Sequence, residues 1–566
     1  MPIQLGESLP PGDAHAVSVS MPTWHDTEGW AKRDPAVLSQ LKSGYPRFYM
    51  PHLVRRLARR LLGWKETQLP EELTVASSAD LFPSRDMALA CREFLRKDLA
   101  KAVGQTVEVL EITFDGRICV VDDKSPGGLI MATRTGDEHA KCLTEKPANC
   151  LARHVYAVVY PDTVAAHAKS FWQHTGFGIS SRFADFWLQH APFLQRMPGE
   201  LKVQEPGQIL PKTGSDTSFM ISSAIANSYG HDVNYENVRL FHTGMSAITH
   251  TAIALKKAMG DRDQVFRVGV FGFLYVDTFK VLSKVLGFEF VLYGNASPED
   301  MDRLDADLAS GLRLGALFTE FPGNPLLGSL DIARLRRLSL RHDFALVVDD
   351  TVGTSVNLDI LPHCDVICTS LTKMFSGGCN VMGGSVVLNP HATYHVLFDQ
   401  AFGHIYQDVY FVLDSATMLS NSLDFEHRIR KASRTAEIMV AQLRASAAVG
   451  RVYYPQGSST QHLYDRVAKP YEETGRRYGF LLSIAFVTPA AAIAFHDALD
   501  VAKGPSLGTN FTLMCAYTLL AHYAELDVVA EYGLREHLVR ISVGLEGADY
   551  LAGLVAEALA AAERQS

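Results

Sequence analysis

The sequence lacks the features that mark repetitive, membrane-spanning and zinc-binding proteins. It has no internal repeat and no low-complexity tract, and its eight cysteines form no CxxC pair and have no clustered histidines. We therefore expect reduced, structural thiols and no metal site. The most apolar stretch, residues 480–499, is interrupted by proline, histidine and aspartate, which argues against a membrane span. Residues 1–20 contain neither a continuous apolar run nor an arginine-rich pattern, so we expect no export signal and a cytoplasmic protein.

Basic residues are also outnumbered by acidic residues. Lys plus Arg number 53 against 62 Asp plus Glu, which gives a formal net charge of -9. A surface of that sign repels phosphate backbones and anionic lipid, so we expect no nucleic-acid partner and no membrane partner. What is present is the composition of a globular chain, 47% hydrophobic and 20% charged over 566 residues. That length is sufficient for two or three packed regions.

The chain is predicted to divide into three regions. Residues 1–215, which include strand-like runs at 107–112 and 154–160, form an N-terminal extension region that ends in a Gly-, Pro- and polar-rich connection at 201–218. Residues 216–425 form a large domain, and residues 426–566 form a smaller α+β C-terminal domain.

The large domain is predicted to be α/β. Short apolar or β-branched runs alternate there with amphipathic helical stretches such as those at 301–310 and 331–342. Strands separated by helices imply a mostly parallel sheet covered on both faces. The predicted strands lie at 268–273, 288–294, 315–321, 345–350 and 366–370.

Polar residues follow several of these strands, where ligands bind in open α/β sheets. Asp349 closes one run, Lys373 follows another, Asn324 follows a third, and residues 244–246 open a predicted helix. A carboxylate, a lysine, an amide and a helix N-terminus suit a cofactor with a pyridine nitrogen, an aldehyde, a phenolic oxygen and a phosphate. The order and spacing of these groups therefore indicate pyridoxal 5'-phosphate.

The sequence also resembles a known family. Segments such as SGYPRFYM, FWQHTGFGISSR, FTEFPGNPLLGS, SLTKMFSG, NVMGGSVVLNP and HLVRISVGLE are similar to those of the Cys/Met metabolism group of pyridoxal-phosphate enzymes. This group contains the cystathionine γ-synthases and γ-lyases, and the chain looks most like the long fungal-type synthases. The resemblance implies the fold of pyridoxal-phosphate enzymes of fold type I, with the N-terminal region packed around the active-site entrance.

Carried over by position, the resemblance assigns the cofactor site. Lys373 becomes the lysine that forms the Schiff base and Asp349 the partner of the pyridinium nitrogen, in agreement with the reading from strand ends. The remaining residues are expected to hold the phosphate, the ring or its phenolic oxygen: Gly244, Met245, Phe271, Asn324, Thr351, Ser370, Thr372 and Arg182. Among these, Arg182 is expected to reach the phosphate of a neighbouring subunit.

Two further residues concern the substrate. Arg540 looks like the arginine that binds the α-carboxylate of the amino acid, since its planar fork gives two parallel hydrogen bonds; a buried pair with an acidic residue is the alternative. Ser506 resembles the residue beside the same carboxylate.

Some positions depart from the family's short form. The expected register places Phe271 where the short form has a tyrosine over the cofactor ring, so acid assistance would have to come from Tyr275 or Lys373. Phe511 replaces a glutamate, which suggests a different second substrate. Cys379 and Leu423 are also unusual, and all of these changes could equally be neutral.

The reaction implied by the resemblance is γ-replacement on an O-acyl-L-homoserine, in which a second, nucleophilic substrate attacks Cγ of a vinylglycine ketimine. Cysteine is the default nucleophile. A carbon nucleophile such as a β-keto acid, an amine, another thiol, elimination by a γ-lyase, and a catalytically silent partner subunit are the alternatives. The resemblance also implies a homodimer or homotetramer.

Overall fold

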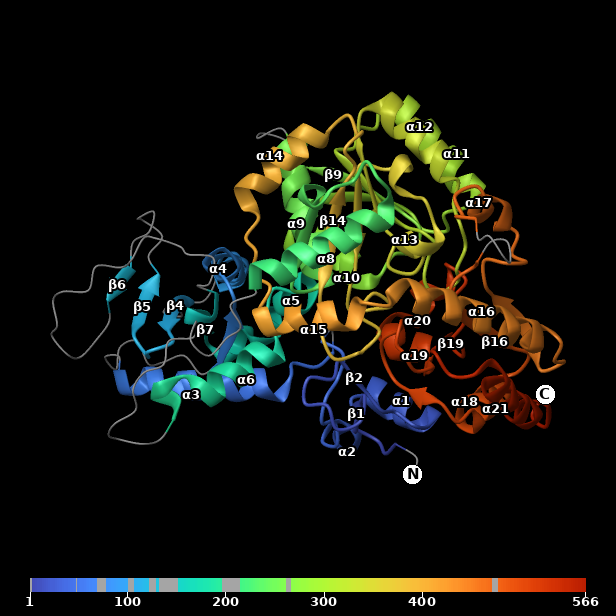
Figure 1. Ribbon diagram of the computed structural model, residues 1–566, viewed down its shortest axis with the longest axis horizontal. Helices are drawn as coiled ribbons and strands as arrows, with labels where there is room; N and C mark the ends of the chain where they lie inside the picture. Colours follow the sequence, from blue (N-terminus) through green and yellow to red (C-terminus); the bar gives the residue numbers. More distant parts are fainter. Residues whose placement is uncertain are drawn as a thin grey trace.

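A computed structural model describes most of the chain. The described residues are 3–46, 48–68, 78–99, 106–121, 129–131, 151–195, 214–260, 266–470 and 477–566. Figure 1 shows a large central domain, a C-terminal domain below it to the right, and a separate N-terminal domain at the left. No helix within the described ranges is both long and apolar enough to cross a membrane.

A seven-stranded sheet forms the centre of the large domain, in the order β10-β9-β11-β12-β13-β14-β8. The first five strands in this order are parallel, and β14 runs antiparallel to both of its neighbours. The mostly parallel sheet predicted from the sequence is thus confirmed. Its strands are β8 (Val238–Phe241), β9 (Arg267–Phe271), β10 (Glu289–Tyr293), β11 (Ala316–Glu320), β12 (Ala345–Asp349), β13 (Val366–Thr369) and β14 (Gly384–Leu388).

Helices cover both faces of this sheet, which explains why its central strands are apolar on both sides. Apolar residues of α9 and α14 pack against one face, and those of α8, α11 and α12 pack against the other. The helices of the domain are α8 (Gly214–Tyr229), α9 (Gly244–Met259), α10 (Val276–Lys280), α11 (Pro298–Ala309), α12 (Ile332–His342), α13 (Thr354–Asn357), α14 (His395–Ile405) and α15 (Val412–Ser422).

The C-terminal domain is α+β, as predicted. The long helix α16 (Phe425–Arg444) leads into a five-stranded sheet in the order β15-β16-β19-β18-β17, in which all neighbours except β17 and β18 are antiparallel. Its other elements are β15 (Val449–Tyr453), α17 (Gln461–Asp465), β16 (Leu481–Phe486), α18 (Pro489–Ala498), β17 (Ala502–Lys503), β18 (Leu513–Ala516), α19 (Tyr517–His522), α20 (Leu526–Ala530), β19 (Val539–Ser542) and α21 (Ala548–Glu563).

The N-terminal domain is built on a second antiparallel sheet, ordered β3-β7-β4-β5-β6. Both strands predicted in this region are present, with β7 at the predicted residues and β4 displaced by one. The strands are β3 (Ser78–Phe82), β4 (Glu108–Thr113), β5 (Ile118–Val121), β6 (Leu129–Met131) and β7 (His154–Tyr160), and the helices are α3 (His52–Gln68), α4 (Arg85–Leu99), α5 (Ala165–Thr175) and α6 (Ser181–His190).

The first residues of the chain do not join this N-terminal domain. An arm made of β1 (Ser8–Leu9), β2 (Ser18–Val19), α1 (Trp24–Ala31) and α2 (Pro35–Leu38) packs instead on the C-terminal domain, where α1 contacts α18 and α19 (Figure 1). Trp24 belongs to the C-terminal core, where its ring stacks on His537 and contacts His496 edge-on. The predicted connection at 201–218 lies outside the described residues as far as residue 213.

Candidate functional site

A cavity lies at the carboxyl ends of the parallel strands, between the three domains. It collects most of the residues that the sequence predicted, although they are spread over nearly 300 positions. The predicted residues that line it are Gly244, Met245, Tyr275, Asn324, Asp349, Thr351, Ser370, Thr372, Lys373, Ser506 and Arg540. Phe271 and Arg182 lie elsewhere.

Lys373 is a buried side chain that points into this cavity from the loop after β13. Its Nζ donates a hydrogen bond to the hydroxyl of Ser506, 2.9 Å away, and lies 4.1 Å from the centre of the Tyr45 ring. Ser506 comes from the C-terminal domain and has a φ of 96°, a conformation that non-glycine residues rarely adopt. Such strained residues concentrate at functional sites, where the surrounding structure holds them in place.

Asp349 ends β12 at the edge of the cavity, where a short hydrogen-bond chain orients it. Its carboxylate accepts from the backbone N–H of Thr351 at 2.9 Å, and the Thr351 hydroxyl accepts from the backbone N–H of Ser370 at 2.8 Å. Burial raises the pKa of Asp349, while the Thr351 hydrogen bonds and the positive charge of Lys373 oppose that shift. A further cation in the cavity would therefore keep this carboxyl group ionised.

A second carboxyl group lies beside Asp349. Glu320 ends β11, and in the register of the two parallel strands it is the partner of Asp349. Burial, and next the charge of Asp349, raise the pKa of Glu320 to about 8. Neighbouring strands lie about 5 Å apart, and two negative charges at such a separation repel by about 3 kcal/mol at an effective dielectric constant of about 20, which favours a proton on one of the two groups.

The N-terminus of α9 is a candidate anion site at the wall of the cavity, beside Ser370. Thr243 caps this helix, accepting a hydrogen bond from the Ser246 N–H, and Gly244 and Met245 form its first turn against the cavity. A Cβ on Gly244 would lie 2.8 Å from the Cβ of Ser370, so this position has no room for a side chain. The helix dipole and the free N–H groups of a first turn favour an anion there.

Arg540, on β19, approaches from the C-terminal domain. It is buried, and it donates to the side-chain oxygen of Asn324 at 3.1 Å and to the Ser506 carbonyl at 2.7 Å. Its guanidinium group also lies 4.6 Å from the centre of the Tyr517 ring. Within the described part of the chain these partners are neutral, so the alternative of a buried pair with an acidic residue does not apply. The charge of Arg540 is directed at the cavity.

Phe271 does not occupy the predicted place over a bound ring. It is fully buried at the end of β9, where it packs near Tyr293 in the core of the large domain. Tyr275, four positions later, lines the cavity instead. The difference from the expected place of Phe271 has a simple cause. Residue 271 is the last residue of β9, whose side chains pack under the helices, whereas residue 275 lies beyond the end of that strand.

The N-terminal segments contribute residues that the sequence reasoning had not assigned. Tyr45 faces Lys373, and the end of α5 supplies Trp172 and Gln173 to the cavity wall. The Gly176 carbonyl accepts from the Thr243 hydroxyl at 2.9 Å, and a Cβ on Gly176 would clash with that hydroxyl. The N-terminal domain therefore packs directly on the anion site, as expected for a region around the entrance. Both contributing segments, SGYPRFYM and FWQHTGFG, had already supported the family resemblance.

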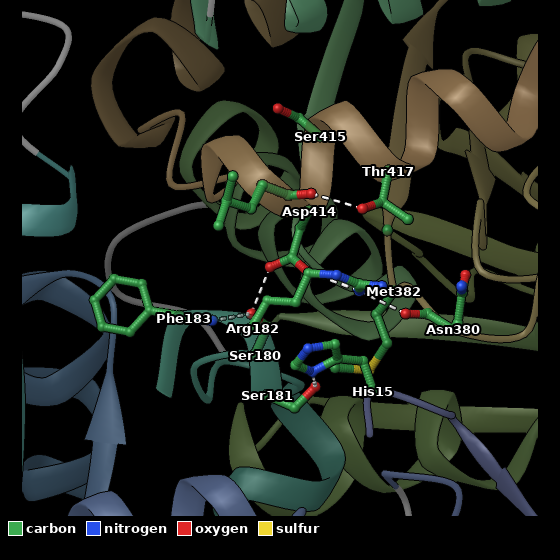
Figure 2. Close-up of polar contacts among 12 residues, drawn as sticks. His15, Ser180, Ser181, Arg182, Phe183, Asn380, Met382, Asp414, Ser415 and Thr417 are labelled. Atoms are coloured by element: carbon green, nitrogen blue, oxygen red, sulfur yellow. Dashed lines mark hydrogen bonds and ion pairs between the residues drawn. The ribbon is translucent and has the colours of Figure 1, made fainter. Parts of the chain in front are cut away.

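Arg182 is paired inside its own chain. Figure 2 shows it between Asp414 on α15 and the backbone of Asn380: its Nη1 donates to the Asn380 carbonyl at 2.5 Å and lies 3.3 Å from an Asp414 oxygen. Ser180 donates to the other oxygen of Asp414. This network joins the N-terminal domain to the large domain, outside the cavity.

The other unusual residues also lie away from the cavity lining. The carbonyl of Phe511 accepts from the Thr509 hydroxyl, Cys379 is buried with a carbonyl that accepts from Val17, and Leu423 is 77% exposed. Burial raises the pKa of the Cys379 thiol to about 12. Phe511 was expected to replace an acidic residue of the substrate pocket. Its side chain does not line the cavity, so this replacement does not alter the cavity wall.

The donor set fits pyridoxal phosphate. The cavity offers a lysine for an aldehyde, a carboxylate at a strand end for a pyridine nitrogen, and a helix N-terminus with no room for a Cβ for a phosphate. The fold agrees, because a cystathionine gamma synthase structure from Xanthomonas oryzae pv. oryzae, in complex with aminoacrylate and cysteine, superposes with a TM-score of 0.53. It is 22% identical and covers 65% of this chain and 90% of its own. Fold and site define a pyridoxal-phosphate enzyme of fold type I.

Sequence comparison names the family. The model for Cys/Met metabolism PLP-dependent enzymes matches residues 194–560, and that for the N-terminal domain of fungal trans-sulfuration enzymes matches residues 53–180. The chain belongs to the Cys/Met metabolism family of pyridoxal-phosphate enzymes, within its fungal trans-sulfuration branch, and pyridoxal 5'-phosphate is its cofactor.

Two curated relatives match along almost their whole length. A cystathionine gamma-synthase of Neurospora crassa is 33% identical, with 100% of this chain and 99% of the relative covered. A cystathionine gamma-synthase-like enzyme of Amanita muscaria is 34% identical, with 99% and 98% covered. The resemblance inferred from motifs is thus confirmed, and the chain is an enzyme of the cystathionine γ-synthase type.

A first prediction concerns the anion site. Gly244→Ala places a methyl group against Ser370, which forces the two sides of the site apart at a cost of about 1–3 kcal/mol. We expect a folded protein whose dissociation constant for pyridoxal phosphate, measured by absorbance titration, rises about tenfold or more. Gly553→Ala on α21, where a Cβ meets nothing within 4 Å, is the matched control and leaves cofactor affinity unchanged. Equal affinity in the two variants would contradict the assignment.

Proposed function

We propose that the enzyme catalyses γ-replacement on an O-acyl-L-homoserine. The observation that carries this proposal is the meeting of Lys373, Asp349 and Arg540 in one cavity, in a chain of the cystathionine γ-synthase type. These three groups suffice to bind an α-amino acid beside the cofactor and to move its protons.

The residues of the large domain that line the cavity are the proposed binding site of the cofactor. Pyridoxal phosphate, when bound, supplies an aldehyde for the substrate amine and a ring that accepts the electron pair left at Cα. Asp349 keeps the ring nitrogen protonated, and Asn324 lies near the phenolic oxygen. Gly244, Met245, Ser370 and Thr372 surround the phosphate, and Thr351 orients Asp349.

The substrate side is set by the C-terminal domain. Arg540 points its guanidinium fork toward the cavity between Asn324 and the Ser506 carbonyl, so a substrate α-carboxylate completes its coordination with two parallel charge-assisted hydrogen bonds. This contact orients the Cα–H bond toward Lys373, which Ser506 holds from the same side.

Lys373 then acts as both base and acid. Its Nζ removes the α-proton and would release it to the bound cofactor, which leaves the amine free to remove a β-proton. The γ-acyloxy group then departs as a carboxylate and takes both electrons of the C–O bond. The nucleophile adds at Cγ, and Lys373 returns protons to Cβ and Cα. A carboxylate leaving group needs little protonation, and the Tyr275 hydroxyl is the proposed donor for what it needs.

The lining of the cavity also favours a second candidate, in which the nucleophile is a carbon acid such as a β-keto acid. Among the described residues the acidic groups of the lining are Glu320 and Asp349, and both lie on the cofactor side. The wall supplied by Phe48, Trp172 and Leu520 is apolar. The ammonium group of cysteine would meet no carboxylate there, whereas a β-keto acid carries no positive charge.

A competition experiment decides between these nucleophiles. Purified enzyme with its cofactor is incubated with O-acetyl-L-homoserine and equimolar cysteine, homocysteine, sulfide and acetoacetate, and products are identified by mass spectrometry. Cystathionine as the main product supports the thioether reaction, and a carbon-linked adduct supports the second candidate. Release of a keto acid and ammonia without any adduct would overturn γ-replacement in favour of elimination.

The assignment of Lys373 has its own test. Lys373→Ala removes the amine that forms the imine, so we expect a folded protein that lacks the visible imine absorbance and loses activity by at least about 1,000-fold. Lys257→Ala, at an exposed position of α9, is the matched control and keeps both. A yellow Lys373→Ala protein would show that another lysine binds the cofactor.

We also propose that the chain forms a homodimer or homotetramer. A cluster of apolar side chains, Phe219 and Met220 on α8 with the adjacent Tyr235, is 46–52% exposed, and the Phe219 and Tyr235 rings lie 4.9 Å apart. Isolated monomers rarely expose such clusters, which fit a second copy of the chain.

Light scattering tests this assembly. Introducing charge with Phe219→Glu plus Met220→Glu is expected to convert a dimer or tetramer into a species of lower mass. Val396→Glu, at a 64% exposed position of α14, is the control and leaves the mass unchanged. A monomeric unsubstituted protein, or a double variant with unchanged mass, would count against this face.

A further inference from the structure

Glu320 holds two other residues of the cavity by their backbones. One oxygen of its carboxyl group accepts from the Tyr275 N–H at 2.5 Å, and the other accepts from the Asn324 N–H at 3.4 Å. Tyr275 begins the segment that leads into α10, and Asn324 lies in the turn after β11. One side chain therefore ties two separate loops to the end of a central strand.

The neighbours of Glu320 determine which carboxyl group carries the charge. Asp349 lies beside it on β12 and receives the Thr351 N–H bond and the field of Lys373. From β19, Arg540 reaches the side-chain oxygen of Asn324. The bonds that Glu320 receives come from neutral backbone groups, one of them long, whereas Asp349 has a cationic neighbour as well. The negative charge is thus better stabilised on Asp349, and the proton on Glu320.

We propose that Glu320 is a positioning residue that remains protonated in the working enzyme, fixing Tyr275 and Asn324 around the cofactor while Asp349 carries the single negative charge. This inference rests on the proposed cofactor site and not on the identity of the nucleophile. A protonated carboxyl group suits this place because it can still accept both N–H bonds without adding a second charge beside Asp349. An apolar residue would leave both buried N–H groups without an acceptor.

Infrared difference spectroscopy tests the proton directly. The cofactor-loaded enzyme is compared with Glu320→Gln, a substitution of the same shape that cannot ionise. At pH 7 we expect the unsubstituted enzyme to show the stretching band of a protonated carboxyl group that is missing from the variant. The pKa of Glu320 is raised, so this band should persist above the usual range for a glutamate and disappear as the pH passes about 8. Loss of an ionised carboxylate band instead would overturn the proposal.

Cofactor binding and kinetics test the positioning. Glu320→Gln keeps one accepting oxygen, which can hold the Tyr275 N–H, and loses only the long bond from the Asn324 N–H. It is therefore expected to keep its visible imine absorbance and most of its kcat, whereas Glu320→Ala, which frees both loops, should lower kcat by about 10- to 100-fold. Glu289→Gln, at an exposed position of β10, is the control for both measurements. A Gln variant as impaired as the Ala variant would show that the neutral form does not suffice.

These outcomes are separable from the proposed reaction. If no homoserine ester is converted but the infrared band and the cofactor absorbance follow the pattern above, the reaction assignment fails and the role of Glu320 stands. If the ester is converted and the band is absent, the reaction stands and the role of Glu320 fails.

Discussion

The registration of three neighbouring parallel strands sets the geometry of the site. Because β11, β12 and β13 are paired in parallel, their carboxyl ends meet at one edge, so Glu320 lies beside Asp349 and the lysine loop begins next to both. A shift of one residue in any strand would turn its terminal side chain to the other face of the sheet. The apolar residues of these strands are buried under helices on both faces, so the packing that stabilises the sheet also fixes which carboxyl groups reach the cavity.

The N-terminal segments complete the site rather than merely flanking it. Tyr45 covers Lys373, and Gly176 packs so closely on Thr243 that a side chain would not fit between them. Arg182 and Asp414 join the same N-terminal domain to the turn at Asn380, seven residues after the lysine. The cavity wall facing Lys373 therefore depends on the N-terminal segments of the chain, while the wall that carries Asp349 and Glu320 depends on the sheet.

Much of the architecture was predictable because its signals are local. The strand at 345–350 and the helix at 331–342 are predicted by the spacing of their apolar residues. Asp349 and Asn324 are predicted because ligands of open α/β sheets bind at the carboxyl ends of the strands. The same rule applied to the run at 315–321 identifies Glu320, which ends its strand as Asp349 does. Glu320 also lies in the segment FTEFPGNPLLGS that supported the resemblance, but only Asn324 of that segment was given a role. Phe271 was expected over the cofactor ring and Tyr275 as a possible acid, and Tyr275 alone lines the cavity, because residue 275 lies past the strand end and residue 271 does not. The contacts of Tyr45 and Arg182 depend on packing between domains, and no local pattern encodes that.

Arg428 links the loop that carries Lys373 in the large domain to the segment near Ser506 in the C-terminal domain. Buried on α16, it donates to the carbonyls of Met374 and Phe375, at 2.9 and 2.7 Å, and to the side chain of Asn510 in the C-terminal domain at 3.1 Å. Burial lowers the pKa of this arginine, and Asp424 opposes that shift. Each buried carbonyl left without its donor would cost about 1–3 kcal/mol, so separating the lysine loop from the C-terminal domain is expensive. The loop that carries Lys373 and the segment that carries Ser506 therefore move together, and the 2.9 Å contact between them is set by the fold itself.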